Sequence, residues 1–324
     1  MSSVPRTLRG GAACARMDLA EAELGKAPSP PIVFTVDVED YFQVAAFRSI
    51  VRPEDWVYYP SRVEDNVSRL LDLCDEHGVR GTWFVLGWEA AQRPHMVRRI
   101  VERGHEVGCH SYWHRPVFEL TPRAFRDDTL LAKDTIEQAG GTEVTGYRAP
   151  SFSIRHDSSW AFAVLADLGF RYDSSVFPVL HPQYGIPDAP PHPYLVQTKS
   201  GPFWELPPAT APAFGRRWPV AGGGYLRQLP AVFCRWGVAH LRDREGHAAV
   251  LYVHPWEIDP DQPRLRAGWV TRLRHYRNLR GMTSRLTSIL RWGPFETASD
   301  RIRVLHRAPE PAWSESAVPV RTIA

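Results

Sequence analysis

Residues 104–114 read GHEVGCHSYWH. Gly104 ends a predicted helix, residues 105–109 form a short predicted strand, and the chain then runs directly into His110. His110 and His114 are four residues apart, a spacing that puts both imidazoles on one face of a helical turn. Two neutral imidazoles and a carboxylate oxygen commonly hold zinc. Since 13 His in 324 residues can supply such a pair by chance, the interpretation depends on the rest of the chain.

Strands and helices alternate on both sides of this stretch. Such alternation is typical of βα units around a parallel sheet or barrel. Short β-branched or aromatic runs predict seven strands, at residues 32–36, 81–86, 105–109, 145–148, 170–173, 203–206 and 249–253. Amphipathic stretches between them predict helices at residues 62–77, 89–103, 122–139 and 158–168.

Polar residues stand at the C-terminal ends of most of the predicted strands. In α/β barrels the chemistry is assembled at this edge. The residues at these positions are therefore candidate site residues: Asp37, His110, Arg148, Asp173 and His254.

The composition is that of a soluble globular protein, with 44% hydrophobic and 23% charged residues. The net charge of +3 is too mild to indicate a nucleic-acid partner, and none is expected. The four cysteines are scattered without a CxxC pair, which predicts reduced, buried thiols.

Residues 1–28 form a polar leader, predicted to be disordered and without the apolar core of a secretory signal. No run approaches 18 apolar residues, so no membrane span is expected. A cytoplasmic location follows by default.

Residues 264–303 carry ten Arg, no Lys and two acids. Within them, residues 283–292 are interpreted as a helix with Leu286, Ile289 and Leu290 on one face. Two interpretations of this arginine-rich segment remain open. The helix can close the barrel, or the arginines can form a face for an anionic glycan, lipid phosphate or the membrane surface.

Five motifs follow one another in the chain: the acidic cluster at residues 37–40, His-Ser-x-x-His at 110–114, Arg-x-Pro at 148–150, Asp173, and a strand that ends in His254. Their order resembles that of the NodB-homology polysaccharide deacetylases, carbohydrate esterase family 4. Three sequence motifs resemble those of the cytoplasmic branch of this family, which is associated with exosortase-type exopolysaccharide systems and carries a C-terminal extension. They are TVDVEDYF at residues 35–42, YRAPSFS at 147–153 and VHPWE at 253–257. The resemblance implies an α/β fold, a distorted (β/α)7 barrel at residues 29–262, and an arginine-rich extension at 263–324 that packs on or continues the barrel.

The resemblance also implies a divalent metal, with zinc as the default and cobalt, nickel or iron suited to the same ligands. His110 and His114 are the expected histidine ligands. The family pattern is two adjacent Asp, a base and then a ligand, whereas this chain has Asp-Val-Glu-Asp. Strand alternation puts Asp37 and Glu39 on the same side, so Asp37 is expected to be the base and Glu39 the third ligand, with Asp40 as its alternative.

The remaining catalytic roles are carried over from the family motifs. Arg148 is expected to pair with the base, and His254 to protonate the departing amine while Asp173 holds it as imidazolium. The backbone N–H of Ser151 is the expected oxyanion donor, although many relatives have an aromatic residue there. Four further residues are expected to contact substrate, although core packing is an equally good reading of the aromatics: Pro150, Phe152, Trp256 and Tyr112.

Together these features predict a metal-dependent hydrolase that removes N-acetyl groups from N-acetylhexosamine units of a polysaccharide or its lipid-linked precursor, in exopolysaccharide biosynthesis. The arginine-rich extension is a candidate contact for the inner membrane face or for polysaccharide-assembly machinery. Two alternatives remain: an amidase on a small substrate, of the allantoinase-like or formamide-hydrolysing type, and a non-catalytic glycan-binding relative.

Overall fold

The computed structural model describes residues 29–181 and 184–307. The predicted leader at residues 1–28 lies outside the described residues, as does the end of the predicted extension. Within the described part of the chain, no helix is long and apolar enough to cross a membrane.

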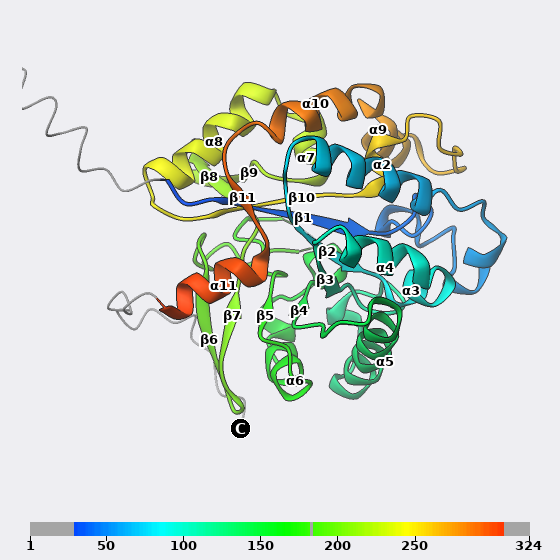
Figure 1. Cartoon of the computed structure of the whole chain (residues 1–324), viewed down its shortest axis with the longest axis horizontal. Helices are drawn as coiled ribbons and strands as arrows, with labels where there is room; N and C mark the ends of the chain where they lie inside the picture. The colour runs from blue at the N-terminus through cyan, green and yellow to red at the C-terminus, as the bar shows by residue number, and fades with distance from the viewer. Residues whose placement is uncertain (1–28, 182–183, 308–324) are drawn as a thin grey trace, which may run out of the picture.

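Seven parallel strands form the wall of a barrel, in the order β10-β1-β2-β3-β4-β5-β7 (Figure 1). All seven predicted strands are confirmed, and so is the distorted (β/α)7 barrel. Their hydrophobic runs have both faces covered, as is usual for parallel strands. The strands are β1 (Ile32–Val38), β2 (Thr82–Val85), β3 (Glu106–Cys109), β4 (Gly146–Tyr147), β5 (Tyr172–Asp173), β7 (Gly201–Glu205) and β10 (Ala249–Val253).

The barrel is irregular at the seam between β7 and β10. The chain after β7 meets β10 through the Pro208–Val250 bridge and a 3.0 Å hydrogen bond from the Ala209 N–H to the Val250 carbonyl. Pro207 and Pro208 have no N–H to give to a ladder, so a regular pairing cannot form here. On its outer side β7 pairs with the antiparallel strand β6 (Tyr194–Thr198), which the sequence patterns did not predict.

Helices cover the outside of the wall. The predicted helix at residues 89–103 is two helices, because Pro94 removes an N–H and restrains the residue before it. The helices of this part are α2 (Val63–Glu76), α3 (Gly87–Gln92), α4 (Pro94–Glu102), α5 (Pro122–Gly140) and α6 (Ala161–Asp167). Short 3-10 turns between elements are η1 (Ala45–Phe47), η2 (Pro53–Tyr58), η3 (Val117–Glu119), η4 (Pro150–Phe152) and η5 (His156–Ser158).

Strand alternation divides the core in two. Phe34, Val36 and Trp83 belong to the large core cluster between the wall and the helices. Val33 and Phe84, which alternate with them, belong to a smaller cluster inside the barrel. Above this inner cluster the barrel interior turns polar, and the site residues lie there.

The C-terminal part of the chain builds the rest of the molecule. A hairpin of β8 (Thr210–Ala213) and β9 (Arg216–Pro219) precedes β10. Strand β11 (Phe295–Glu296) pairs with the start of β1, and Ala298 and Ile302 of the last helix join the inner barrel cluster. The elements are α7 (Gly223–Gln228), α8 (Ala231–Asp243), η6 (Pro255–Ile258), α9 (Trp269–Tyr276), η7 (Leu279–Gly281), α10 (Met282–Ile289) and α11 (Ala298–Arg307). The division of the chain at residue 263 stays a prediction.

Candidate active site

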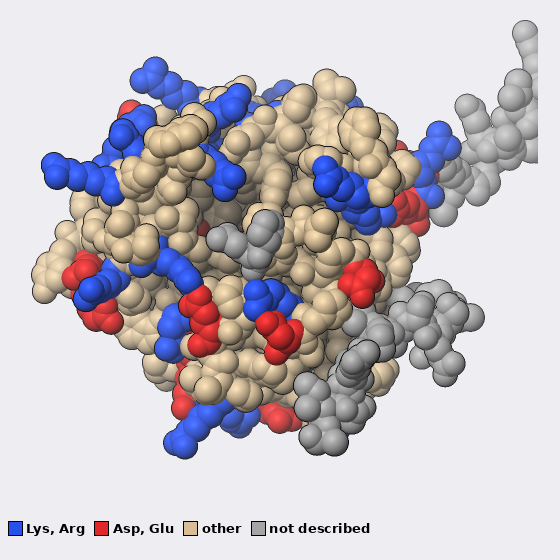
Figure 2. Space-filling model, turned by 180° about the vertical axis from the view of Figure 1, so that it is seen from behind, with Lys and Arg blue, Asp and Glu red and all other residues tan. Residues whose placement is uncertain are grey.

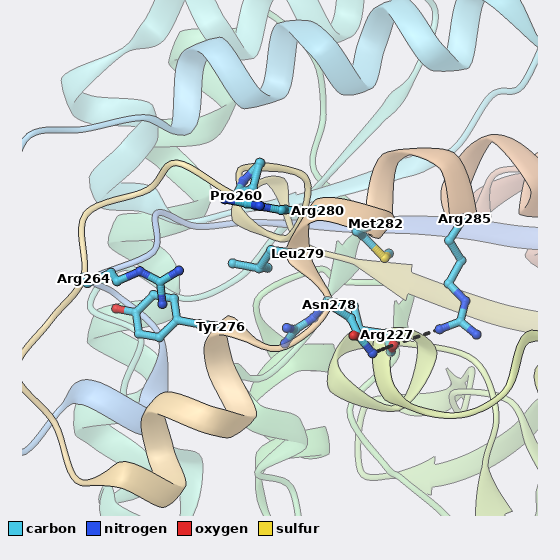
Figure 3. Close-up of a pocket in the computed structure, with 10 residues that line it drawn as sticks. Arg227, Pro260, Arg264, Tyr276, Asn278, Leu279, Arg280, Met282 and Arg285 are labelled. Atoms are coloured by element: carbon cyan, nitrogen blue, oxygen red, sulfur yellow. Dashed lines mark hydrogen bonds between the residues drawn. The ribbon is translucent and has the colours of Figure 1, made fainter.

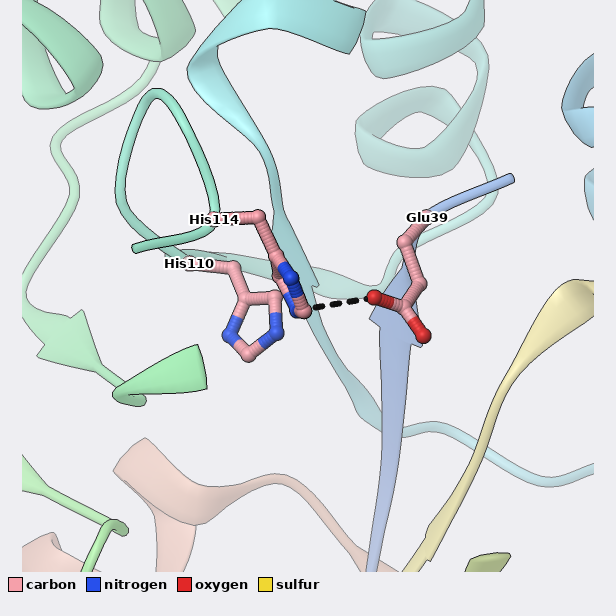
Figure 4. A group of neighbouring side chains, drawn as sticks. All are labelled: Glu39, His110 and His114. Carbon is pink, nitrogen blue, oxygen red and sulfur yellow. Dashed lines mark ion pairs between the residues drawn. The ribbon is translucent and has the colours of Figure 1, made fainter. Parts of the chain in front are cut away.

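A carboxylate and two imidazoles converge at the C-terminal end of the barrel (Figure 4). One ligand atom from each of Glu39, His110 and His114 lies within 4.8 Å of the other two. The Oε2 atom of Glu39 is 2.8 Å from Nε2 of His114. The side chains of Glu39 and His114 are only 2% and 6% exposed, so this cluster is enclosed by protein.

Two loops bring the cluster together. Glu39 follows the last residue of β1, and His110 follows the last residue of β3. The expected helical turn between the histidines is wrong, because residues 110–116 form an irregular loop. Ser111 and His114 have φ angles of 63° and 52°, in the left-handed region that side chains rarely adopt. This backbone turns His114 back towards His110, whose ring centroid is 5.3 Å away.

Neighbouring groups orient two members of the cluster. Nδ1 of His110 lies 2.8 Å from the carbonyl oxygen of Arg148, so in the neutral ring Nδ1–H donates and Nε2 keeps its lone pair. Burial lowers the pKa of His110 to about 4, which keeps the ring neutral. The indole N–H of Trp256 donates to Oε1 of Glu39 at 3.1 Å.

The residues present fit a divalent metal. Oε2 of Glu39 is buried without an aligned hydrogen-bond donor, although His114 Nε2 is close. A shared cation would satisfy two such facing lone pairs. Burial opposes the charge on Glu39, but His114, His254 and His110 outweigh it and lower the pKa of Glu39 to about 2. The carboxylate is therefore ionised, as a ligand must be.

Asp40, the alternative ligand, has a different task. Its Oδ2 accepts hydrogen bonds from the Ser61 hydroxyl at 2.7 Å and from the N–H groups of Arg62 and Val63 at 2.8 and 3.2 Å. Its Oδ1 accepts from the N–H of Tyr41. Asp40 thus satisfies N–H groups at the start of α2, and among the two candidates only Glu39 belongs to the cluster.

Asp37 and Arg148 form a buried ion pair beside the cluster. Nη1 of Arg148 donates to Oδ1 of Asp37 at 2.7 Å, and both side chains are nearly inaccessible. The guanidinium also donates to Thr35 and Ser174, and it lies over the Phe84 ring at 4.3 Å. These contacts fix Arg148 and leave Oδ2 of Asp37 facing His254 at 3.8 Å.

The partner of His254 is Glu257, and the expected pairing with Asp173 is wrong. Nδ1 of His254 lies 3.1 Å from Oε2 of Glu257, while Glu257 Oε1 accepts from Nε of Arg227 at 2.6 Å. This leaves Nε2 of His254 near Asp37 and near Oε1 of Glu39, at 3.8 and 3.7 Å. Burial favours the neutral ring, but these carboxylates prevail and raise the pKa of His254 to about 9.

Asp173 supports a neighbouring loop instead. Its Oδ1 accepts from the Ser175 hydroxyl at 2.5 Å, and that hydroxyl in turn accepts from the Ala149 N–H at 2.7 Å. Burial, together with the nearby Asp173 charge, raises the pKa of Glu205 well above its ordinary value, which favours a shared proton on this carboxyl pair. Asp173 therefore anchors the segment that follows Arg148.

The loop with the expected oxyanion donor has an unusual backbone. Ser151 and Phe152 both have positive φ, at 57° and 53°. Of the six non-glycine residues with positive φ in the described chain, four lie in the two loops of this site, which follow β3 and β4. Such conformations persist where the surrounding structure holds them, often at functional sites. The oxyanion role of Ser151 itself stays a prediction.

The expected substrate contacts are mostly buried. Trp256 is 4% exposed and stacks on His254 and on His275, so it positions the site rather than offering a free platform. Phe152 is 7% exposed and packs against Phe177. Pro150 is buried, and Tyr112 is half-buried against Trp113. For these four residues the structure favours the packing role.

The sequence motifs did not predict that Glu257 and Arg227 belong to the site. Glu257 lies within the VHPWE motif, three residues after His254, and accepts from both the backbone N–H and Nδ1 of that histidine. The His-x-x-Glu spacing at a strand end was an available signal for it. Arg227 lies about 30 residues earlier on α7, and no local pattern connects it to the site.

Fold and site together define an α/β barrel whose polar residues gather at the C-terminal ends of its strands. The family model of the polysaccharide deacetylases matches residues 55–172, and that of a domain of unknown function, DUF3473, matches residues 174–303. Residues 55–172 thus match the polysaccharide deacetylase domain that the motifs predicted.

Curated relatives agree with this assignment. The chain is 32% identical over 112 residues to a peptidoglycan deacetylase-like protein of Gibberella zeae, over 34% of this chain and 32% of that protein. It is 31% identical over 113 residues to a peptidoglycan deacetylase of Helicobacter pylori, over 35% and 38% of the two chains. The chain thus spans about a third of the length of the curated relatives it matches.

A solved structure with the same fold comes from Mycobacterium smegmatis and is assigned to the polysaccharide deacetylases. It is 20% identical, covers 87% of this chain and 94% of its own, and has a TM-score of 0.57. At this identity the likeness establishes the fold alone.

Proposed function

We propose that the protein is a metal-dependent N-deacetylase that hydrolyses the acetamide of N-acetylhexosamine units in a glycan. The observation that carries the proposal is the convergence of Glu39, His110 and His114 beside Asp37 and His254. A polysaccharide-binding protein has no need of a ligand set, a fixed base and an acid in one enclosed place. Relatives named peptidoglycan and chitooligosaccharide deacetylases support the substrate class.

Glu39, His110 and His114 are the residues that would hold the metal. When bound there, a divalent ion supplies Lewis-acid polarisation of the acetamide carbonyl and acidifies water. Zinc is our choice for this donor set, although cobalt, nickel and iron suit the same ligands.

The chain's own residues perform the proton transfers. Arg148 occupies Oδ1 of Asp37, so Oδ2 is the atom that takes a proton from the attacking water. His254, held through Nδ1 by Glu257, donates its Nε2 proton to the departing amine. The N–H of Ser151 donates to the oxyanion of the tetrahedral intermediate. The products are acetate and the free amine.

The test is acetate release from N-acetylglucosamine oligomers by the full chain. We expect turnover that a chelator abolishes and added metal restores. The H110A/H114A variant should lose both metal and activity. The D37N variant should keep its metal and lose activity by about 100-fold or more, because it lacks the base.

Two results would contradict the proposal. Acetate release by H110A/H114A equal to wild type would remove the metal from the reaction. Turnover of small ureides or formamides, with none of the oligomers, would favour the small-substrate amidase.

We further propose a role in exopolysaccharide biosynthesis on the cytoplasmic side of the membrane. Support comes from the motifs at residues 35–42, 147–153 and 253–257, which resemble the exosortase-associated branch. Deleting the gene should raise the acetyl content of the cell's secreted polysaccharide, and fractionation should find the protein with the cytoplasm or inner membrane.

A further inference from the structure

Helix α9 (Trp269–Tyr276) turns apolar side chains to solvent. Trp269 is 77% exposed, Leu273 51% and Val270 41%. At about 100° per residue these three side chains share an arc of about 100° on one side of the helix. The opposite side holds His275, which is buried. The helix is therefore amphipathic, with its apolar side facing outward.

Arginines flank this apolar side. Arg272 and Arg274 are both exposed and project on either side of the arc defined by Trp269 and Leu273. The surrounding sequence is also basic, since residues 262–295 hold eight Arg and no Asp or Glu. Within the described chain, none of these eight arginines forms an ion pair with a carboxylate.

The surface charge follows this distribution. Figure 2 shows the molecule from behind, so that the upper right of Figure 1, where α9 lies, appears at the upper left. Basic side chains there have few acidic neighbours, whereas basic and acidic side chains stand next to each other lower down. The exposed cations are therefore available to an anionic partner.

A basic pocket lies beside α9 (Figure 3). It measures about 460 Å³, and its lining includes Arg264, Arg280 and Arg285 but, in the described chain, no acidic residue. Arg264 lies over the ring of Tyr276 at 4.8 Å, and Arg285 donates to backbone carbonyls. Arg227 also reaches the pocket, but Glu257 neutralises it. The free charges can hold a phosphate-bearing headgroup.

The surface borders the active site. His275, on the buried side of α9, stacks on Trp256 with ring centroids 4.3 Å apart. Trp256 in turn contacts Glu39 and stacks on His254. In Figure 1, β1 points towards the end of the molecule at which α9 lies. A partner on α9 would thus lie next to the mouth of the barrel.

We propose that α9 and the neighbouring basic pocket dock the protein on an anionic lipid bilayer. Trp269, Leu273 and Val270 enter the headgroup region, and the flanking arginines bind lipid phosphates. A tryptophan next to leucine and valine, framed by arginines without acids, is the composition of an interfacial helix. A second copy of the chain fits less well, because two such faces would oppose like charges.

Vesicle co-sedimentation of the full chain tests the proposal. We expect binding to phosphatidylcholine vesicles with about 30% phosphatidylglycerol, weakened by salt, and little binding to pure phosphatidylcholine. R272Q/R274Q should bind about 30-fold more weakly. W269S/L273S should lose about tenfold or more. Acetate release from soluble oligomers by W269S/L273S should equal that of wild type, since neither residue belongs to the site.

Matched controls lie elsewhere on the surface. Phe214 is 92% exposed in the β8–β9 hairpin, and the exposed Arg123 and Arg171 belong to other parts of the molecule. F214S and R123Q/R171Q should bind vesicles as wild type does. Equal losses in these controls, or no binding by wild type, would overturn the proposal. So would a fall in molar mass of W269S/L273S by light scattering, which would assign the face to self-association.

Discussion

Two adjacent acids, Glu39 and Asp40, have separate tasks that residue type alone does not separate. Glu39 faces the histidines, whereas Asp40 binds the N–H groups at the start of α2. The difference comes from the end of β1 at Val38, beyond which the backbone turns and sends successive side chains to different surroundings. One acid belongs to the site, and the other stabilises the loop that carries it.

Substitution of each acid should separate these tasks. E39A should lose stoichiometric metal, because it removes one of three ligands. D40N should keep its metal but unfold at lower urea concentration, with about 1 to 2 kcal/mol less stability, because an Asn has one acceptor oxygen where Asp has two. Metal analysis and urea titration of both variants check this. Loss of metal in D40N, with metal retained in E39A, would reverse the assignment.

We expect Glu257 to act through His254, which it contacts at Nδ1. E257Q should keep its metal and lose about 10- to 100-fold in kcat, since second-shell partners of this kind commonly have such effects. The loss should shrink for an aryl ester, whose leaving group needs no proton. A merely structural defect would slow both substrates equally, which would contradict the proposed role.

His105 is a candidate for acid sensitivity away from the ligands. Its Nδ1 accepts from the Gly81 N–H, and burial lowers its pKa to about 4. Between pH 6.5 and 4 the unfolded chain therefore binds the extra proton, and stability falls with falling pH by up to about 3 kcal/mol. H105N keeps an acceptor without titrating. The wild-type loss of unfolding free energy over this range should exceed that of H105N, and identical slopes would contradict the assignment.

At the scale of elements, helix α11 closes the amino end of the barrel. Ala298 and Ile302 pack with Val33 and Phe84 inside the wall. The first N–H groups of α11 donate to Thr82 Oγ1 at 2.8 Å and to Glu106 Oε2 at 3.0 Å. The C-terminal region is therefore part of the barrel core.

Truncation of Ile302 tests this packing. I302A should destabilise the protein by about 2 to 5 kcal/mol, the range for a buried Ile to Ala change. Metal content should not change, because the site lies at the other end of the barrel. Urea unfolding and metal analysis measure both. A loss below about 0.5 kcal/mol would place α11 outside the core.

The sequence predicted elements better than it predicted contacts. Each barrel strand is a local apolar run bounded by Gly, Pro or polar residues, so local patterns found all seven. The geometry of His110 and His114 depends on the positive φ angles of Ser111 and His114. Neither residue type predicts a positive φ from sequence. The predicted partner of His254 was wrong because a position at a strand end shows only which residues lie at the same edge of the barrel. It does not show which of these residues are in contact.

At the scale of the whole molecule, the site joins both family matches. His110, His114 and Arg148 lie within the polysaccharide deacetylase match, whereas His254 and Glu257 lie within the match to the domain of unknown function. The wall itself crosses this division, since β1 pairs with both β2 and β10. The C-terminal region thus completes the barrel and contributes His254, the proposed acid.

Anomalous X-ray scattering from crystals of the full chain grown with zinc would locate the metal directly. We predict one strong peak within about 2.0 to 2.3 Å of Glu39 Oε2 and of one ring nitrogen each of His110 and His114. A peak coordinated by Asp40, or none between the two histidines, would contradict the assignment.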